Sequence, residues 1–413
     1  MDSDSWASCP FCDSHVPSSQ LTWHANAHFW DLDGDFDLPP IIHPSPNSPP
    51  QSQSQSLPRE QAANGSRSGA NYLHDGDTGS DNEECEVNKK ISCLIGSQTR
   101  SKFYIVETGM MALLRNCLES EAGTTNSILS GYVDHFQCLE SEDAGWGCGW
   151  RNIQMLSSHL LVQRPEARKA LFGGSGFVPD IPSIQRWLEI AWEKGFDAPG
   201  SAQFNNVISG SKKWIGTTEC AALLCSFALR ARVVDFGPKE SQSVPCSSAD
   251  NTRNKASIHS MVKRKAKKGE GYQVLMDFVW NYFSDKSSIQ FGQQHVVISE
   301  KTPLYFQHDG HSRTIVGIQV NQQQKRHLQY NLLVLDPAHS TAALERSLRQ
   351  KVGWEKLIKR GMHTLKKPQY QLCYVDPGIA NEEEMEKLKT IHNSASRALV
   401  ASSRSNIAGF FSK

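Results

Sequence analysis

The sequence predicts an α+β domain with a central, mostly antiparallel sheet, preceded by a small unit rich in cysteine and histidine. In the first half of the apolar region, apolar residues recur at helical spacing. In the second half, short strands with alternating apolar residues follow one another, as in an antiparallel sheet packed against helices. Closely spaced cysteine and histidine pairs within the first 30 residues predict the separate N-terminal unit.

Changes in composition divide the chain into four parts and one insertion. Residues 1–30 form the small unit, and residues 31–90 read as a disordered, low-complexity linker because Pro, Ser and Gln cannot bury a core. The α+β domain is expected over residues 91–391, interrupted by a flexible basic insertion at 238–270. Residues 392–413 are expected to be a frayed tail.

Within the domain the expected elements follow the period of the apolar residues. Helices are predicted at 103–118, from Cys148 to about Leu161, at 184–194, from Trp214 onward with Thr217 or Thr218 as its cap, at 274–283, after Ser340 and, rich in Glu and Lys, at the end of the domain. Strands are predicted at 232–236, 294–298, 303–307, 313–320, 329–336 and 370–375.

Charge and cysteine usage exclude several classes of protein. Lys+Arg and Asp+Glu both total 43, so no global field favours nucleic acid or an anionic membrane. No stretch approaches the roughly 18 apolar residues of a membrane span, and no N-terminal signal peptide is evident. The 11 scattered cysteines predict reduced thiols, and therefore a cytoplasmic or nuclear protein.

The residues around Cys148 predict a reactive thiol. Cys148 is flanked by glycines and opens a predicted helix, where the helix dipole stabilises a thiolate. Gly145, Trp146 and Gly147 precede it and are expected to line a narrow channel for an extended substrate tail, because glycines allow close approach of two main chains.

A thiol nucleophile needs a base and a group that orients the base. If strands 313–320 and 329–336 form a hairpin that pairs about its centre, His311 lies opposite Asp336 at its open end. His339 is the alternative base, because it follows Asp336 closely. The Cys148 backbone N–H is one expected donor to the oxyanion, and Gln307 or a residue just before the cysteine is another.

The N-terminal unit has the ligand spacing of a zinc finger. Cys9, Cys12, His24 and His28 suit a structural, tetrahedral Zn²⁺ ion. No Lys or Arg precedes Arg59, so the unit cannot neutralise phosphates, and we expect a protein ligand for it instead of nucleic acid.

Taken together, these residues resemble a family of cysteine peptidases that includes the proteases specific for the ubiquitin-fold modifier (UFM). The nucleophile motif runs from Asp143 to Leu156. The blocks around Trp214, Gln307 to Thr314 and Leu335 to Pro337 resemble the branch of zinc-finger deubiquitinases, of the type "zinc finger with UFM-specific peptidase domain". Ala338 breaks the Asp-Pro-His triplet of the modifier-specific branch.

The resemblance implies a papain-like fold, with Cys148 as nucleophile, His311 as base, Asp336 as orienter and Gln307 near the oxyanion. It implies hydrolysis of the bond after the diglycine tail of ubiquitin, with a preference for polyubiquitin chains of the lysine-sixty-three type, and links to the nucleus. A protease for UFM, and a non-catalytic adaptor that binds ubiquitin chains, are the alternatives. No metal is expected in catalysis.

Overall fold

The computed structural model describes residues 6–8, 15–17, 79–121, 125–237, 270–284, 295–308, 310–321, 329–365, 367, 369–391 and 393–395. The residues divide into two units, Met1–Glu83 and Glu84–Lys413. In the first unit, strands β1 (Trp6–Ser8) and β2 (His15–Pro17) pair antiparallel, with Ser8 opposite His15. The part of the chain that the structure describes contains no helix with both the length and the apolar content to cross a membrane.

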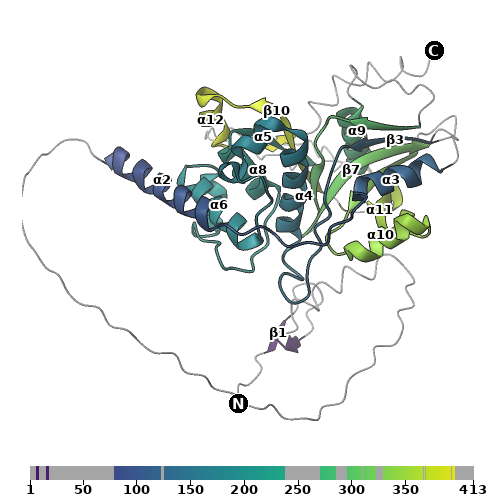
Figure 1. The fold of residues 1–413 in the computed structure, drawn as a ribbon, viewed down its shortest axis with the longest axis horizontal. Coiled ribbons are helices and arrows are strands. Elements are labelled where there is room, and N and C mark those ends of the chain that lie inside the picture. The colour runs from purple at the N-terminus through teal and green to yellow at the C-terminus, as the bar shows by residue number, and fades with distance from the viewer. Residues whose placement is uncertain are drawn as a thin grey trace, which may run out of the picture. The chain divides into compact units, whose positions relative to one another are not determined.

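The second unit is an α+β domain, as predicted, with helices on both faces of a sheet (Figure 1). Its helices are α2 (Gly79–Ser97), α3 (Met110–Glu119), α4 (Cys148–Gln163), α5 (Pro165–Ala170), α6 (Ile181–Glu193), α7 (Ala198–Gln203), α8 (Thr217–Ser226), α9 (Glu270–Phe283), α10 (Thr341–Gln350), α11 (Trp354–Ile358) and α12 (Glu382–Leu388). Short 3₁₀ turns are η1 (Leu171–Gly174) and η2 (Met362–Thr364).

The strands of the sheet are β3 (Thr125–Ser130), β4 (Leu229–Phe236), β5 (Val296–Ser299), β6 (Leu304–His308), β7 (His311–Asn321), β8 (Gln329–Leu335), β9 (Lys359–Gly361), β10 (Tyr370–Ile379) and β11 (Asn393–Ala395). Most neighbours are antiparallel, but β3 pairs parallel with β5, and β11 pairs parallel with β4. The sheet is therefore mixed, with mostly antiparallel neighbours as expected and two parallel pairs.

Strand β7 organises the sheet. One edge of β7 pairs with β8, and the other edge pairs first with β6 and then with β3. The register of β7 against β8 shifts between Ile315 and Gly317, where a Cβ on Gly317 would lie 2.3 Å from the carbonyl oxygen of Ile128. Only glycine fits this close approach of β3 to β7.

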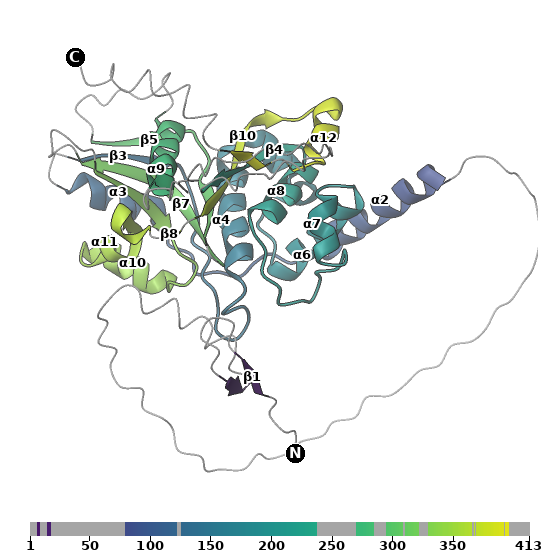
Figure 2. The same ribbon diagram turned by 180° about the vertical axis from the view of Figure 1, so that it is seen from behind.

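Alternation along the strands separates two apolar cores. Val233, Tyr305 and Cys373 pack with α3, α4, α6, α8 and α10 on one face, whereas the neighbouring residues Val234 and Phe306 pack with α9 on the other. Figures 1 and 2 show α4 and α9 on opposite sides of the sheet. Alternate residues along a strand therefore face α4 and α9 in turn.

Several predicted boundaries differ from the structure. The helix expected from residue 103 begins at Met110, because Gly109 has a φ of 77°, outside the helical region. Gly216, not Thr217 or Thr218, caps α8, and its N–H donates to Glu219 Oε2 (2.6 Å). Helix α2 starts at Gly79 inside the predicted linker, and β11 lies inside the predicted tail.

Candidate active site

Cys148 is the first residue of α4, as predicted, and its side chain is half-buried. Burial raises the pKa of the Cys148 thiol, although hydrogen bonds from Ser312 and from the Gly149 N–H act in the opposite direction. The predicted position at the helix N-terminus is confirmed, and burial there opposes the stabilisation of a thiolate. A nearby base has to remove the proton.

Asn152 ties Cys148 to the sheet. Its Nδ2 donates to the Cys148 carbonyl (2.7 Å) and to Ser312 Oγ (2.9 Å), and its Oδ1 accepts from Thr314 Oγ1 (2.8 Å). Asn152 is fully buried, so these bonds are shielded from water. The side chain of Ser312 is thereby held against the sulfur.

The loop before Cys148 is held by one buried ion pair, which we name the Asp143–Arg151 clamp. Arg151 Nε donates to Asp143 Oδ2 (2.8 Å) and Arg151 Nη2 to Asp143 Oδ1 (2.9 Å), a bidentate arrangement. The Asp143 carboxylate also accepts a hydrogen bond from the Leu139 N–H (2.8 Å). The Asp143 carbonyl accepts one from the Gly147 N–H (2.7 Å). The clamp therefore fixes both ends of the loop that leads to Cys148.

The glycines on either side of Cys148 are packed too closely for side chains. A Cβ on Gly147 would lie 2.0 Å from Asp143 Oδ2, and one on Gly149 would lie 2.7 Å from the Ile215 carbonyl oxygen. Gly145 has a φ of 86°, and its carbonyl accepts a hydrogen bond from Trp214 Nε1 (2.7 Å). The segment 145–147 and the loop that carries Trp214 thus lie side by side next to Cys148.

Gln307 lies on the same face of the sheet as α4 and α8. Its Oε1 accepts from the Thr217 N–H at the start of α8 (3.0 Å), and its cross-strand partner on β7 is Ser312. The Nε2 atom of Gln307 makes no hydrogen bond to the residues that the structure describes. This places an amide donor beside the strand that contacts the thiol.

The predicted hairpin forms between β7 and β8, but its register is different from the expected one. Thr314 pairs with Leu335, so the next position along places Arg313, not His311, opposite Asp336. Arg313 Nε donates to Asp336 Oδ2 (2.5 Å), and the Ala338 N–H donates to Asp336 Oδ1 (3.1 Å). Burial raises the pKa of Asp336, but Arg313, His339 and the Ala338 N–H together outweigh burial and hold that pKa well below its usual range.

The two candidate bases occupy different places. His311 begins β7 and pairs with His308 on β6, with the two ring centroids 6.3 Å apart. The His339 N–H donates to the Asp336 carbonyl (3.0 Å), and burial lowers the pKa of His339 while Asp336 raises it. The observed hairpin register therefore gives no reason to prefer His311 over His339 as the base.

A buried histidine supports the turn that follows β8. His135 hydrogen-bonds through Nε2 to the Asp336 carbonyl (3.0 Å) and through Nδ1 to Thr341 Oγ1 (2.8 Å). Burial lowers the pKa of His135 to about 4, so the ring is neutral at pH 7. The Cys138 N–H donates to the Pro337 carbonyl (2.7 Å) and fixes the same turn.

Sequence reasoning missed Asn152, Ser312 and Arg313 as parts of the site. A signal existed for the first, because a residue four positions after Cys148 lies above it on the same helix face. The predicted zinc ligands Cys9, Cys12, His24 and His28 lie outside the described residues, and so does the basic run at 263–268.

The chain is similar to a known family of peptidases and to several named proteins. The profile of peptidase family C78 matches residues 123–373. "Zinc finger-containing ubiquitin peptidase 1" of Macaca fascicularis is 33% identical over 281 residues, which cover 67% of this chain and 42% of that protein. The chain thus aligns with about two fifths of the length of that relative.

Two further relatives align with different shares of the chain. "Ubiquitin carboxyl-terminal hydrolase mug105" of Schizosaccharomyces pombe is 28% identical over 263 residues, 64% of this chain and 88% of that protein. "Probable Ufm1-specific protease 1" of Drosophila melanogaster is 36% identical over 101 residues, 24% of this chain and 36% of that protein. The alignments with the two relatives whose names refer to ubiquitin cover more than half of this chain, whereas the alignment with the Ufm1-specific relative covers 24% of it.

Proposed function

The chain belongs to peptidase family C78, and on that premise we propose that it is a cysteine isopeptidase that hydrolyses the bond after the diglycine tail of ubiquitin. The observation that carries the proposal is Cys148 at the first position of α4, with Ser312 and the Gly149 N–H directed at its sulfur. The relatives that align over most of the domain are named as ubiquitin peptidases or hydrolases.

In the proposed reaction, Cys148 attacks the carbonyl carbon of the terminal glycine of ubiquitin. The base takes the thiol proton and delivers it to the leaving lysine amine, so that a thioester forms and the isopeptide bond breaks. Water, activated by the same base, then hydrolyses the thioester. The Cys148 backbone N–H and Gln307 Nε2 donate to the oxyanion in both steps.

His311 is the base in this proposal, because it stands in the Gly-His-Ser-Arg-Thr block of the zinc-finger branch. Asp336 is the orienter, since a carboxylate with a lowered pKa stays charged opposite an imidazolium. The contact of His339 with Asp336 favours His339 as the second candidate. His311→Ala and His339→Ala separate the two: the variant that loses about 10³-fold in kcat identifies the base.

Specificity for a diglycine tail follows from the packing around Gly145, Trp146 and Gly147. The hydrogen bond from Trp214 to Gly145 brings an indole to this segment, so a tail residue with a side chain would meet it. Trp214→Ala should therefore allow cleavage of a tail that ends in Ala-Gly, which the unmodified protein rejects. Unchanged rejection by the variant would count against the channel.

The N-terminal unit completes the proposal. Cys9 and Cys12 stand in sequence between the paired strands β1 and β2, and with His24 and His28 they form a donor set that suits a structural zinc ion. These four residues would hold the metal, which supplies no catalytic chemistry. We further assign polyubiquitin chains of the lysine-sixty-three type as substrate, and the cytoplasm and nucleus as location, on the resemblance to the zinc-finger branch.

Two electrophilic activity probes, one made from ubiquitin and one from UFM, test the proposal directly. The ubiquitin probe should label Cys148, and Cys148→Ala should remove both labelling and chain hydrolysis while chain binding persists. Labelling by the UFM probe alone would assign the protein to the modifier instead. Chain binding without any turnover by the unmodified protein would make it an adaptor.

A further inference from the structure

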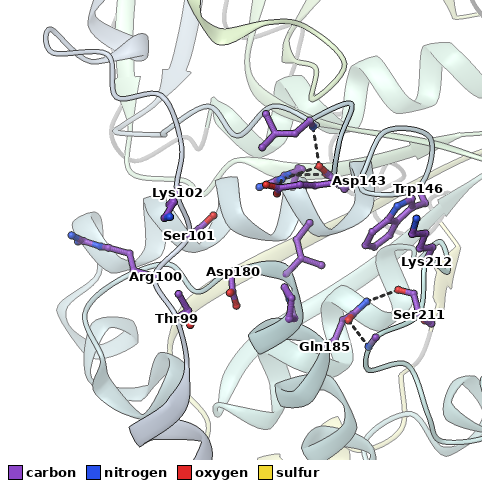
Figure 3. A pocket seen from close by; sticks show the side chains of 16 residues that line it. Thr99, Arg100, Ser101, Lys102, Asp143, Trp146, Asp180, Gln185, Ser211 and Lys212 are labelled. Carbon is purple, nitrogen blue, oxygen red and sulfur yellow. Dashed lines mark hydrogen bonds and ion pairs between the residues drawn. The ribbon is translucent and has the colours of Figure 1, made fainter. Parts of the chain in front are cut away.

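A pocket of about 510 Å³ lies beside the nucleophile loop (Figure 3). Its walls come from the segment 99–102, the loop before Cys148, the N-terminus of α6 and the loop 210–212. This volume is within the range of sites that bind small organic molecules, roughly 300–1,000 Å³. None of the steps proposed for catalysis takes place inside it.

The body of the pocket is apolar. Leu139, Trp146, Ile181 and Pro182 contribute to its lining, and Trp146 offers an aromatic side chain to an occupant. Gln185 lies at the lower end, where both ends of its amide are already used by the Ser211 carbonyl (2.9 Å) and the Gly210 N–H (3.0 Å). An occupant therefore has to be mainly apolar.

Positive charges outnumber negative ones in the lining of the pocket: Arg100, Lys102, Arg151 and Lys212 against Glu142, Asp143 and Asp180. Arg100 and Lys102 stand at one side and Lys212 at the other, next to Trp146 (Figure 3). Lys102 and Lys212 are exposed and form no ion pair with any described residue. Their ammonium groups are thus available to an anion.

The acidic residues of the lining are already engaged. Asp143 is neutralised by Arg151, and Glu142 lies 3.7 Å from the same guanidinium. Asp180 caps α6, where its Oδ1 accepts from the Ser183 N–H (2.9 Å). The positive end of the α6 dipole also faces this region.

We propose that this pocket binds a small organic anion with a flat apolar body, such as an aromatic carboxylate, and that an occupied pocket changes the reactivity of Cys148. The apolar body lies against Trp146 and the carboxylate lies at Lys212 beside it, while Lys102, on the other side of the pocket, adds a longer-range attraction. The site adjoins the proposed diglycine channel at Trp146, and its occupant is not the ubiquitin tail.

The coupling to Cys148 follows from the shared wall. Trp146 stands two positions before Cys148, and its N–H donates to the Asp143 carbonyl (3.2 Å). An occupant that contacts Trp146 therefore acts on the short segment that the Asp143–Arg151 clamp holds in place. A small displacement there changes the distance between the sulfur and Ser312.

The test compares 2-naphthoate with 2-naphthamide, which has the same rings without the charge. Titration calorimetry on the full chain should give saturable binding of the acid, and about fivefold or more weaker binding of the amide. Lys212→Ala should weaken binding of the acid by about 3- to 10-fold and Lys102→Ala by a smaller factor, whereas Lys356→Ala, an exposed lysine on α11, should leave it unchanged.

The second readout is the alkylation rate of Cys148 by iodoacetamide, followed by mass spectrometry at that residue. Saturating 2-naphthoate should change this rate by about twofold or more. This rate does not depend on ubiquitin, so the result is independent of the proposed substrate. Absence of saturable binding, equal affinity for acid and amide, insensitivity to both lysine substitutions, or an unchanged alkylation rate would each overturn the proposal.

Discussion

Arg151→Met is expected to destabilise the domain by about 3–5 kcal/mol. The side chains of Arg151 and Asp143 are 5% and 1% exposed, so removal of the guanidinium leaves a carboxylate buried without its partner. The Asp143 carboxylate keeps the hydrogen bond from the Leu139 N–H but loses both bonds of the bidentate pair. Urea unfolding followed by tryptophan fluorescence measures the difference in the free energy of unfolding.

The double variant Asp143→Asn/Arg151→Met separates the cost of the lone charge from the loss of packing. Because both charges are gone, it should recover at least about 2 kcal/mol relative to Arg151→Met alone. Lys387→Met is the matched control: its pair with Glu383 is 70% and 79% exposed, so it should cost less than about 0.5 kcal/mol. The clamp would be refuted if the effects of the two substitutions on the free energy of unfolding were additive in the double variant, or if Arg151→Met lowered that free energy by less than about 1 kcal/mol.

Three further predictions follow from single contacts. Burial lowers the pKa of His135 to about 4, so the unfolded chain takes up the proton first. The stabilisation that comes from the neutral His135 is therefore fully present above about pH 6.5, and the free energy of unfolding falls by about 3 kcal/mol towards pH 4. His135→Gln should flatten this dependence of the unfolding free energy on pH, as measured by urea unfolding. An equal slope in the variant would contradict the prediction. Gly147→Ala should lower the free energy of unfolding by more than about 2 kcal/mol, because the added Cβ has no space. The control Gly96→Ala on α2, whose Cβ would have nothing within 4 Å, should raise it by up to about 1 kcal/mol; thermal unfolding measures both. Ser312→Ala should lower kcat for ubiquitin cleavage about 10-fold with little change in KM, and an unchanged kcat would remove Ser312 from the reaction.

Much of the architecture could be predicted, because the period of the apolar residues is a local signal. Helices α4, α6 and α9 and strands β6 and β8 lie within a few residues of their predicted positions. Strand β3 was missed: its sequence Thr-Asn-Ser-Ile-Leu-Ser lacks alternation, and it owes its place to β5 and β7 on either side.

The candidate site could be predicted in part. The position of Cys148 at the start of a helix follows from the flanking glycines and the apolar spacing behind it. The register at Asp336 could not be found by centring the hairpin, because the irregularity near Gly317 depends on how closely β3 approaches β7. The burial that raises the pKa of the Cys148 thiol likewise depends on residues far away in the chain.

The bond between Asn152 and Ser312 joins residues 160 positions apart, which has a consequence for biosynthesis. Cys148 leaves the ribosome long before β7 exists, and β4 must wait for β10, at residues 370–379, before its antiparallel pairing can form. Such distant pairings form late in folding. A nascent or truncated chain that lacks β7 and β8 therefore carries Cys148 without Ser312 and Asp336 beside it, so the proposed hydrolysis requires that these later segments have been synthesised and folded.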